Sequence, residues 1–340
     1  MAGGAISRSL AQGGYDMEKV KWGVLGTAGI AAGQTIPGML KASKCELYAV
    51  AGRSLAKAES YKERFGFAKA YGSYDELLAD EEVCAVYVPL PNDLHKEWVI
   101  KALNAGKHVL CEKPIALNAK EAEEMFDAAR KNNVYLMEAY AYLHSPYVKN
   151  LKDDVSSGLI GDILYIDTSF VTQGYKEDIR IHKSKGGGAV YDLGCYCTTM
   201  ILSLTDQNPV KVSAAAEFGY DDVDVMTSAV IGFDGGLRAS FNVGMVLGEE
   251  KFGRYDNLFV YGTKGYIRSA VEYNQEGKAE YKIYLDDEVI TRSFDLPQNY
   301  SLEIDQLSGC ILSGDTPYVT EGFSLKNLKL MDEILEKIGY

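Results

Sequence analysis

The regular alternation of short apolar runs with longer amphipathic segments, from about residue 21 to residue 142, constrains the fold of this chain most. Runs with strand composition occur at 21–26, 46–54, 68–73, 83–90, 108–114 and 134–142, and helix-like segments separate them. Ser73 and Asn118 lie where helix N-caps belong, and Gly66 and Gly106 follow helix-like segments. Strands separated by helices need crossover connections, so the sequence predicts an α/β fold with a mostly parallel sheet.

The pattern changes after about residue 145, where strand-like runs follow one another. A helix-like segment at 145–158 comes first, a helix with an apolar stripe lies at 324–338, and the strand-like runs are at 163–172, 210–218, 225–233, 236–244, 257–262, 265–270 and 280–286. This order predicts a C-terminal α+β domain with a large open, mainly antiparallel sheet. Such a sheet can leave one face free, and that face is our candidate surface for a homodimer or homotetramer.

Charge and cysteine content exclude several classes of partner. The chain carries 35 lysines and arginines against 48 acids, a formal net charge of −13, so neither nucleic acid nor an anionic membrane is expected. The six cysteines lack zinc or redox spacing, and Cys45, Cys84 and Cys111 lie in strand-like runs, as small buried residues do. This use of cysteine favours a reducing, cytoplasmic location. Because the four histidines are scattered without ligand spacing, we expect no metal site.

A glycine-rich turn, GVLGTAGIAAG, follows the first strand-like run. A dinucleotide-binding turn needs glycine where the chain reverses and where a pyrophosphate approaches the backbone. Gly26 fits the first glycine of that fingerprint, and Gly29 stands beside Ala28 at the second. An ordinary strand-to-helix loop is the alternative, but a turn that opens an alternating series favours a Rossmann nucleotide site, with Thr27 and Ile30 among its residues.

The end of the second strand-like run bears on the choice of cofactor. NAD-specific folds usually place a carboxylate there for the ribose hydroxyls, whereas the 2′-phosphate of NADP needs cations and hydroxyl donors. The chain has Arg53, Ser54 and Lys57 at this point and no competing acid. A solvated helix start with Ser54 as its N-cap is the alternative. We therefore expect NADP(H), with NAD(H) as the second choice.

Lys113 stands at the exit of the fifth strand-like run, within VLCEKPIA. Ligands of open α/β sheets bind outside the carboxyl ends of the strands, so this lysine is expected at the nicotinamide end of the site. Pro114 restricts the lysine to extended backbone angles and can take a cis bond. A surface lysine on a loop is the alternative.

Four motifs resemble those of one enzyme family. GTAGIA, VPLPNDLH, HVLCEKPIA and GGGAVYDLGCY are similar to motifs of the Gfo/Idh/MocA oxidoreductases, and the resemblance covers essentially residues 20 to 340. It is strongest to the branch of dimeric dihydrodiol dehydrogenases and NADP-dependent xylose dehydrogenases. It implies a nucleotide-binding Rossmann domain, a second domain with an open sheet, and a site at their junction in which Lys113 is catalytic.

The motif GGGAVYDLGCY supplies two more candidates. It ends in D-x-x-x-H in many members and in D-x-x-x-Y in the dihydrodiol branch, and this chain has Asp192 and Tyr196. Oxidation of a secondary alcohol needs a base at the hydroxyl, and a free tyrosine with a pKa of about 10 is a poor one. A neighbouring lysine cation lowers that pKa, so Lys113 and Tyr196 form a plausible acid–base pair. Asp192 would orient Lys113 or hold a substrate hydroxyl.

Other candidates follow from position in the chain. The residues in or just beyond the last part of the fourth and fifth strand-like runs that we expect to line the cofactor are Pro89, Leu90, Asn92, His95 and Glu112. A helix-start role for His95 and a structural role for Glu112, or one at the nicotinamide ribose, are the alternatives. The residues that we expect near a polyol pocket are Tyr140, His144, Tyr175 and His182.

With 340 residues the chain is long enough for two domains. We expect the Rossmann domain at 17–143 and a substrate-binding and oligomerisation domain at 144–340, with 1–16 as a leader or tag. The predicted function is NADP(H)-dependent oxidoreduction of a secondary hydroxyl of a sugar, cyclic polyol or trans-dihydrodiol. The alternatives are a glycoside-cleaving enzyme of the same fold that oxidises its substrate transiently with NAD, and a nucleotide-sensing regulator without turnover.

Overall fold

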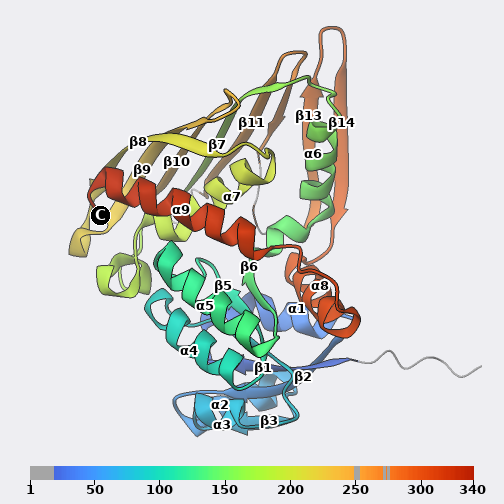
Figure 1. Cartoon of the computed structure of the whole chain (residues 1–340), viewed down its shortest axis with the longest axis vertical. Helices are drawn as coiled ribbons and strands as arrows, with labels where there is room; N and C mark the ends of the chain where they lie inside the picture. Colours follow the sequence, from blue (N-terminus) through green and yellow to red (C-terminus); the bar gives the residue numbers. More distant parts are fainter. Residues whose placement is uncertain (1–18, 249–252, 271–272, 274–275) are drawn as a thin grey trace, which may run out of the picture.

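The computed structural model describes residues 19–340 except 249–252, 271–272 and 274–275. The predicted leader at 1–16 lies outside the described residues. The described chain forms a six-stranded sheet from its first part and an eight-stranded sheet from its second (Figure 1). The predicted fold class, an α/β unit followed by an α+β unit, is confirmed. The exact boundary near residue 143 stays a prediction.

The first sheet has the strand order β3-β2-β1-β4-β5-β6, and all neighbouring strands are parallel. Its strands are β1 (Val20–Leu25), β2 (Cys45–Ala51), β3 (Lys69–Tyr71), β4 (Ala85–Val88), β5 (His108–Glu112) and β6 (Leu136–Ala139). The strand order reverses between β1 and β4. The carboxyl ends of these central strands therefore form the crevice in which open α/β sheets bind ligands.

Helical segments connect the strands of this sheet. They are η1 (Ala31–Thr35), α1 (Ile36–Lys41), α2 (Leu55–Phe65), α3 (Tyr74–Leu78), α4 (Asn92–Asn104) and α5 (Ala119–Asn132). The side chains of Ser73 and Asn118 accept hydrogen bonds from the backbone N–H groups of Glu76 and Glu121, at 3.2 and 2.9 Å. These contacts confirm the two predicted N-caps, which satisfy N–H groups that the first helical turn leaves unpaired.

The second sheet has the order β14-β13-β12-β11-β7-β10-β9-β8, and only β7 and β10 are parallel neighbours. Its strands are β7 (Ile163–Gln173), β8 (Pro209–Phe218), β9 (Asp224–Phe233), β10 (Arg238–Leu247), β11 (Tyr255–Gly262), β12 (Tyr266–Ser269), β13 (Gly277–Tyr284) and β14 (Val289–Leu296). Helices α6 (Pro146–Ser156), α7 (Cys195–Ser203) and α9 (Glu321–Ile338) pack against this sheet (Figure 1). The sequence analysis missed β14, which pairs with β13 at the sheet edge.

The sequence analysis also missed helix α8 (Asn299–Ser313). This helix belongs to the second part of the chain but packs on α1 and on β1 and β2 of the first sheet. The indole Nε1 of Trp22 donates to the hydroxyl of Ser308 at 3.0 Å. A Cβ atom at Gly38 would lie 2.7 Å from the Cβ of Tyr300, so the glycine lets the two helices approach. The two parts of the chain therefore share a packed interface.

The environment of the cysteines differs from the expectation at one position. Cys45 and Cys111 are buried in β2 and β5, but Cys84 precedes β4 and is exposed. The apolar run begins at Val83, two residues before β4, and Cys84 therefore lies outside the strand, where it meets solvent. In the described part of the chain, no helix combines the length and the apolar character needed to cross a membrane.

Candidate active site

A cavity of about 570 Å³ lies where the two parts of the chain meet. From the first part, it is lined by the turn after β1 and by the carboxyl ends of β4 and β5. From the second part, it is lined by β7 and by the chain between Tyr175 and Tyr196. The lining residues are Ala28, Gly29, Ile30, Pro89, Leu90, Pro91, Asn92, Glu112, Lys113, Pro114, Phe170, Thr172, Tyr175, Asp178, Ile179, Arg180, Lys185, Gly186, Gly187, Gly188, Asp192, Leu193, Tyr196 and Arg254.

Lys113 directly follows β5, and the peptide bond to Pro114 is cis. Its ammonium donates to the carbonyl oxygen and to Oδ1 of Asp192, at 2.8 and 3.2 Å, and lies 4.6 Å from the ring centroid of Tyr196. Burial alone would lower the pKa of Lys113, but the negative charges of Tyr196 and Asp192 raise it above the ordinary lysine value. The structure thus brings the three predicted catalytic residues together around one cation.

Asp192 lies in the short π-helical segment η5 (Val190–Gly194), which continues into α7. Its second carboxylate oxygen is 2.9 Å from Nε of Arg180, so the carboxylate faces two cations. Burial alone would raise the pKa of Asp192, but the charges of Lys113 and Arg180 and their hydrogen bonds hold it below the ordinary value. Asp192 is therefore ionised at neutral pH and fixes the position of Lys113.

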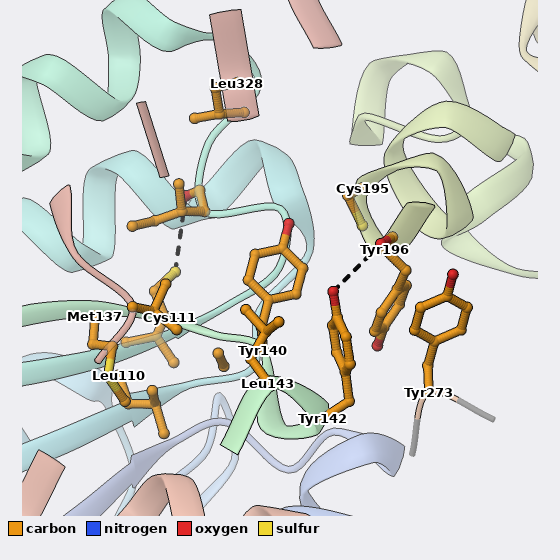
Figure 2. Close-up of a cluster of buried hydrophobic side chains, with 14 of the residues drawn as sticks. Leu110, Cys111, Met137, Tyr140, Tyr142, Leu143, Cys195, Tyr196, Tyr273 and Leu328 are labelled. Carbon is orange, nitrogen blue, oxygen red and sulfur yellow. Dashed lines mark hydrogen bonds between the residues drawn. The ribbon is translucent and has the colours of Figure 1, made fainter. Parts of the chain in front are cut away.

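Tyr196 lies in the first turn of α7, and aromatic rings surround it (Figure 2). Its ring centroid is 5.2 Å from that of Tyr273 and 5.7 Å from those of Phe170 and Tyr142. The hydroxyl of Tyr142 donates to the carbonyl oxygen of Tyr196 at 3.4 Å. The cluster holds the ring of Tyr196 in one orientation at the wall of the cavity.

The loop of three glycines before η5 passes close to the chain on both sides. A Cβ atom at Gly187 would lie 2.5 Å from the carbonyl oxygen of Arg180. Gly188 has φ +106°, and a Cβ atom there would lie 2.2 Å from Oδ1 of Asp224. Asn92 on α4 donates to the carbonyl oxygen of Gly186 at 2.9 Å, which ties this loop to the first part of the chain. Only glycine fits this close approach.

The predicted nucleotide turn lines the same cavity. Gly26 has φ +122°, and its N–H donates to the carbonyl oxygen of Ala51 at 2.9 Å, which fixes the turn against the end of β2. Ala28, Gly29 and Ile30 line the cavity. A Cβ atom at Gly29 would meet no heavy atom within 4 Å, so there is open space beside the backbone for a phosphate group. The turn therefore fits a dinucleotide.

The remaining predicted nucleotide residues lie beside this turn but outside the cavity lining. Thr27 faces α2, where its carbonyl oxygen accepts from the hydroxyl of Tyr61 at 3.1 Å. Arg53, Ser54 and Lys57 are exposed at the end of β2 and the start of α2. Ser54 is the N-cap residue of α2, but its side chain makes no capping hydrogen bond. Its hydroxyl is therefore not used by the helix.

Four of the five residues predicted to line the cofactor at the ends of β4 and β5 line the cavity, namely Pro89, Leu90, Asn92 and Glu112. His95 does not, and the expected contact with the cofactor is corrected here. Its ring is fully buried, with Nε2 2.8 Å from the carbonyl oxygen of Leu90 and Nδ1 3.0 Å from that of Pro114. Burial lowers the pKa of His95. The ring ties together two loops that line the cavity.

Of the four residues expected near the polyol pocket, only Tyr175 lines the cavity. Tyr140 is fully buried and accepts a hydrogen bond from Asn327 at 3.3 Å. His144 packs beside Tyr318, and burial lowers its pKa to about 3.

His182 does not line the cavity itself but lies beside Tyr220 in a second hollow, and Tyr175 lines both. The predictions for Tyr140 and His144 are corrected, because position in the chain does not show which way a side chain points. A role for His182 near the mouth of the pocket stays a prediction.

Two arginines of the cavity were missed by the sequence analysis. Arg180 contacts Asp192, and its guanidinium lies 5.1 Å from the ring centroid of Tyr175. Arg254 lies 4.6 Å from the ring of Phe170 and donates to Asp256 at 2.6 Å. Arg180 stands only six residues before the three-glycine loop. This proximity was the one local feature of the sequence that could have identified Arg180 as a cavity residue.

Comparison with known proteins places this arrangement in a family. Residues 20–140 match the oxidoreductase family with an NAD-binding Rossmann fold, and residues 148–268 match the Gfo/Idh/MocA C-terminal domain. The chain belongs to the Gfo/Idh/MocA oxidoreductase family. The resemblance inferred from its motifs is therefore confirmed, and the protein is an oxidoreductase.

Relatives of this Gfo/Idh/MocA oxidoreductase span nearly its whole length. An NADP+-dependent D-xylose 1-dehydrogenase of Haloferax volcanii is 34% identical over 93% of this chain and 96% of its own length. A trans-1,2-dihydrobenzene-1,2-diol dehydrogenase of Xenopus tropicalis is 30% identical over 94% of this chain and 98% of its own. A 3-ketoreductase of Actinomadura kijaniata, crystallised with NADP and TDP-benzene, has a TM-score of 0.86 at 30% identity, covering 94% of this chain and 98% of its own.

Proposed function

We propose that this oxidoreductase uses NADP(H) to interconvert a secondary hydroxyl of a sugar, cyclic polyol or trans-dihydrodiol with the corresponding carbonyl. The observation that carries the proposal is the contact of Lys113 with Asp192 and Tyr196 on the wall of a cavity that also reaches the nucleotide turn. The named activities of the relatives, on xylose and on a dihydrodiol, support this class of substrate.

The bound nicotinamide supplies the acceptor or donor of hydride. The chain itself has to hold the carbinol oxygen and move its proton. Tyr196 is the residue that exchanges this proton, and the ammonium of Lys113 stabilises negative charge on the tyrosine and on the carbinol oxygen. Asp192, ionised and held by Arg180, keeps Lys113 in place. The aromatic cluster behind Tyr196 excludes water from one side of the pair.

We propose NADP(H) rather than NAD(H), because the residues that follow β2 are cationic or hydroxylic. Arg53, Ser54 and Lys57 are exposed beside the nucleotide turn, where a 2′-phosphate needs charge and hydrogen-bond donors. A Cβ atom at Gly52 would lie 3.6 Å from a methyl carbon of Thr27, so the two loops lie close together. The NADP named for two relatives supports the same choice.

The uncovered face of the second sheet supports a proposal of self-association. Val230 on β9 and Ser240 on β10 are register partners, and Asp167 on β7 and Phe259 on β11 continue the row across that face. The rings of Tyr266 and Tyr284 stack at 4.6 Å on the same sheet. We propose that a second copy of the chain covers this face in a homodimer or homotetramer.

The six free thiols support a reducing, cytoplasmic location.

The proposal is tested by the reduction of NADP+ at 340 nm against a panel of aldoses, cyclic polyols and trans-dihydrodiols. We expect turnover with at least one class, and its loss in Lys113→Ala and Tyr196→Phe. Lys101, which is exposed on α4, gives a matched control, since Lys101→Ala removes a cation outside the cavity. Release of an aglycone from glycosides without net nucleotide reduction would instead favour the glycoside-cleaving alternative, and an absence of turnover with every class would favour the nucleotide sensor.

A further inference from the structure

Glu112 is a nearly buried acid that forms part of the cavity wall. It is the last residue of β5, directly before Lys113, and 9% of its surface is exposed. The hydroxyl of Tyr87 donates to its Oε1, and the hydroxyl of Thr35 donates to that of Tyr87 at 2.8 Å. Tyr87 and Thr35 are fully buried, so this chain of hydrogen bonds fixes one carboxyl oxygen of Glu112 against β4 and the segment after the nucleotide turn.

Charged groups from both parts of the chain lie around Glu112. Lys113, the next residue, and Arg180 from the second part of the chain attract its negative charge. Burial raises the pKa of Glu112 above its ordinary value, although the hydrogen bond from Tyr87 and the charge of Lys113 act against that rise. Helix α8 contributes Tyr300 and Glu303, both of which interact with the charge of Glu112.

Glu303 is a second acid close to Glu112, but it does not line the cavity. It is fully buried, and neither of its carboxyl oxygens has a hydrogen-bond partner among the described residues. Burial, followed by the charge of Glu112, raises its pKa well above the ordinary value. Because only Glu112 of this pair lines the cavity, it is the acid that a cation in the cavity reaches.

The redox ring of the cofactor changes its charge by one during the reaction. The oxidised nicotinamide is a cation and the reduced ring is neutral. Transfer of hydride requires contact between the ring and the carbon that Lys113 and Tyr196 serve, so the ring has to occupy the cavity that Glu112 lines. A carboxylate attracts the cationic ring and not the neutral one, and the low dielectric of a nearly buried site strengthens that attraction.

We propose that Glu112 senses the redox state of the cofactor, its carboxylate stabilising bound NADP+ selectively over bound NADPH. This inference rests on the proposed function, because it assumes a nicotinamide dinucleotide in the cavity. The direction of the pH dependence of NADP+ affinity follows from the linkage between nucleotide binding and ionisation of Glu112. A cation beside Glu112 favours the ionised carboxyl, so NADP+ binding releases a proton, and NADP+ affinity rises as pH rises through the pKa of Glu112 in the free protein. NADPH affinity has no such dependence on this residue.

The experiment measures dissociation constants for NADP+ and NADPH by fluorescence, from roughly pH 5 to pH 9. In Glu112→Gln we expect NADP+ to bind about tenfold more weakly, the equivalent of one pKa unit, and NADPH to bind within about twofold of the wild type. Glu303→Gln is the matched control, because it removes a buried acid that does not line the cavity, and it should leave the ratio of the two constants unchanged. An equal loss for both nucleotides in Glu112→Gln, or no loss for either, would overturn the proposal.

A second variant keeps the test decisive if Glu112→Gln does not fold. Tyr87→Phe removes a hydrogen bond that stabilises ionised Glu112, so the rise in NADP+ affinity should move to higher pH. A rise at an unchanged pH would contradict the role of Glu112. If the wild-type protein binds neither nucleotide, the proposed function fails. If it binds both with the same pH dependence, only the redox sensing fails.

Discussion

The ammonium of Lys113 donates to both the main-chain carbonyl and the carboxylate of Asp192, a residue 79 positions further along the chain, at 2.8 and 3.2 Å. One residue comes from the end of a parallel strand and the other from the helical segment that leads into α7. Their contact joins the first part of the chain to the second. Chemistry at this cavity therefore depends on how the two parts pack.

Replacement of Arg180 by Gln should change the pH profile of the reaction. The guanidinium helps to hold the pKa of Asp192 below its ordinary value, so its removal raises that pKa. Asp192 then becomes protonated at a higher pH, and the acid limb of kcat/KM should move upward by about one pH unit. Arg238→Gln, at an exposed position on β10, is the matched control. An acid limb that does not move in Arg180→Gln would show that Asp192 is not held through this pair.

Tyr196→Phe should lower kcat by roughly 100- to 10,000-fold, because the proton has no carrier, while the ring still fills the aromatic cluster. Tyr273→Phe is the control within the same cluster. It removes a hydroxyl that lies 2.9 Å from that of Thr168 and should lower the free energy of unfolding by about 1 kcal/mol. Steady-state kinetics and urea unfolding separate the two effects. A near-normal kcat in Tyr196→Phe would remove this tyrosine from the reaction.

Arg53→Asp should reverse the charge beside the nucleotide turn. We expect NADPH to bind roughly 10- to 100-fold more weakly, because a charge-assisted hydrogen bond to the 2′-phosphate is lost and repulsion replaces it. NADH lacks that phosphate and should bind within about threefold of its wild-type affinity. Arg64→Asp, which is exposed at the other end of α2, controls for charge alone. Equal weakening of both nucleotides would argue against a 2′-phosphate site.

Asp224→Asn should change the dependence of stability on pH. Burial raises the pKa of Asp224 from 3.8 to about 6, so the folded wild type resists ionisation of this carboxyl. Its contribution to stability is present below pH 3.8 and is lost as pH rises to about 6. The variant has no proton to lose, so its free energy of unfolding should gain roughly 2 to 3 kcal/mol relative to the wild type across that range. Urea unfolding at several pH values checks this, and a constant difference would contradict it.

Charges on the uncovered sheet face should disrupt a dimer. Val230 and Tyr261 are 53% and 45% exposed there, and replacement of both by Glu would bury like charges against each other in a two-fold interface. Sedimentation velocity should show the wild type as an oligomer and the double variant as a monomer. Leu312→Glu introduces a charge at an exposed apolar position on α8 and should leave the assembly intact. A double variant that sediments like the wild type would place the interface elsewhere.

The sequence by itself determined the two-part architecture, because helix and strand periodicities are local and recur at regular intervals. The strand exit before a proline also singled out Lys113, and the resemblance of GGGAVYDLGCY to a family motif singled out Asp192 and Tyr196.

Tertiary structure alone decided which residues meet. It placed Arg180 in contact with Asp192 and α8 against the first sheet, and it buried His95 and Tyr140 away from the cavity. These outcomes depend on the direction of side chains in loops and on contacts between distant segments, and no local pattern in the sequence encodes either of them.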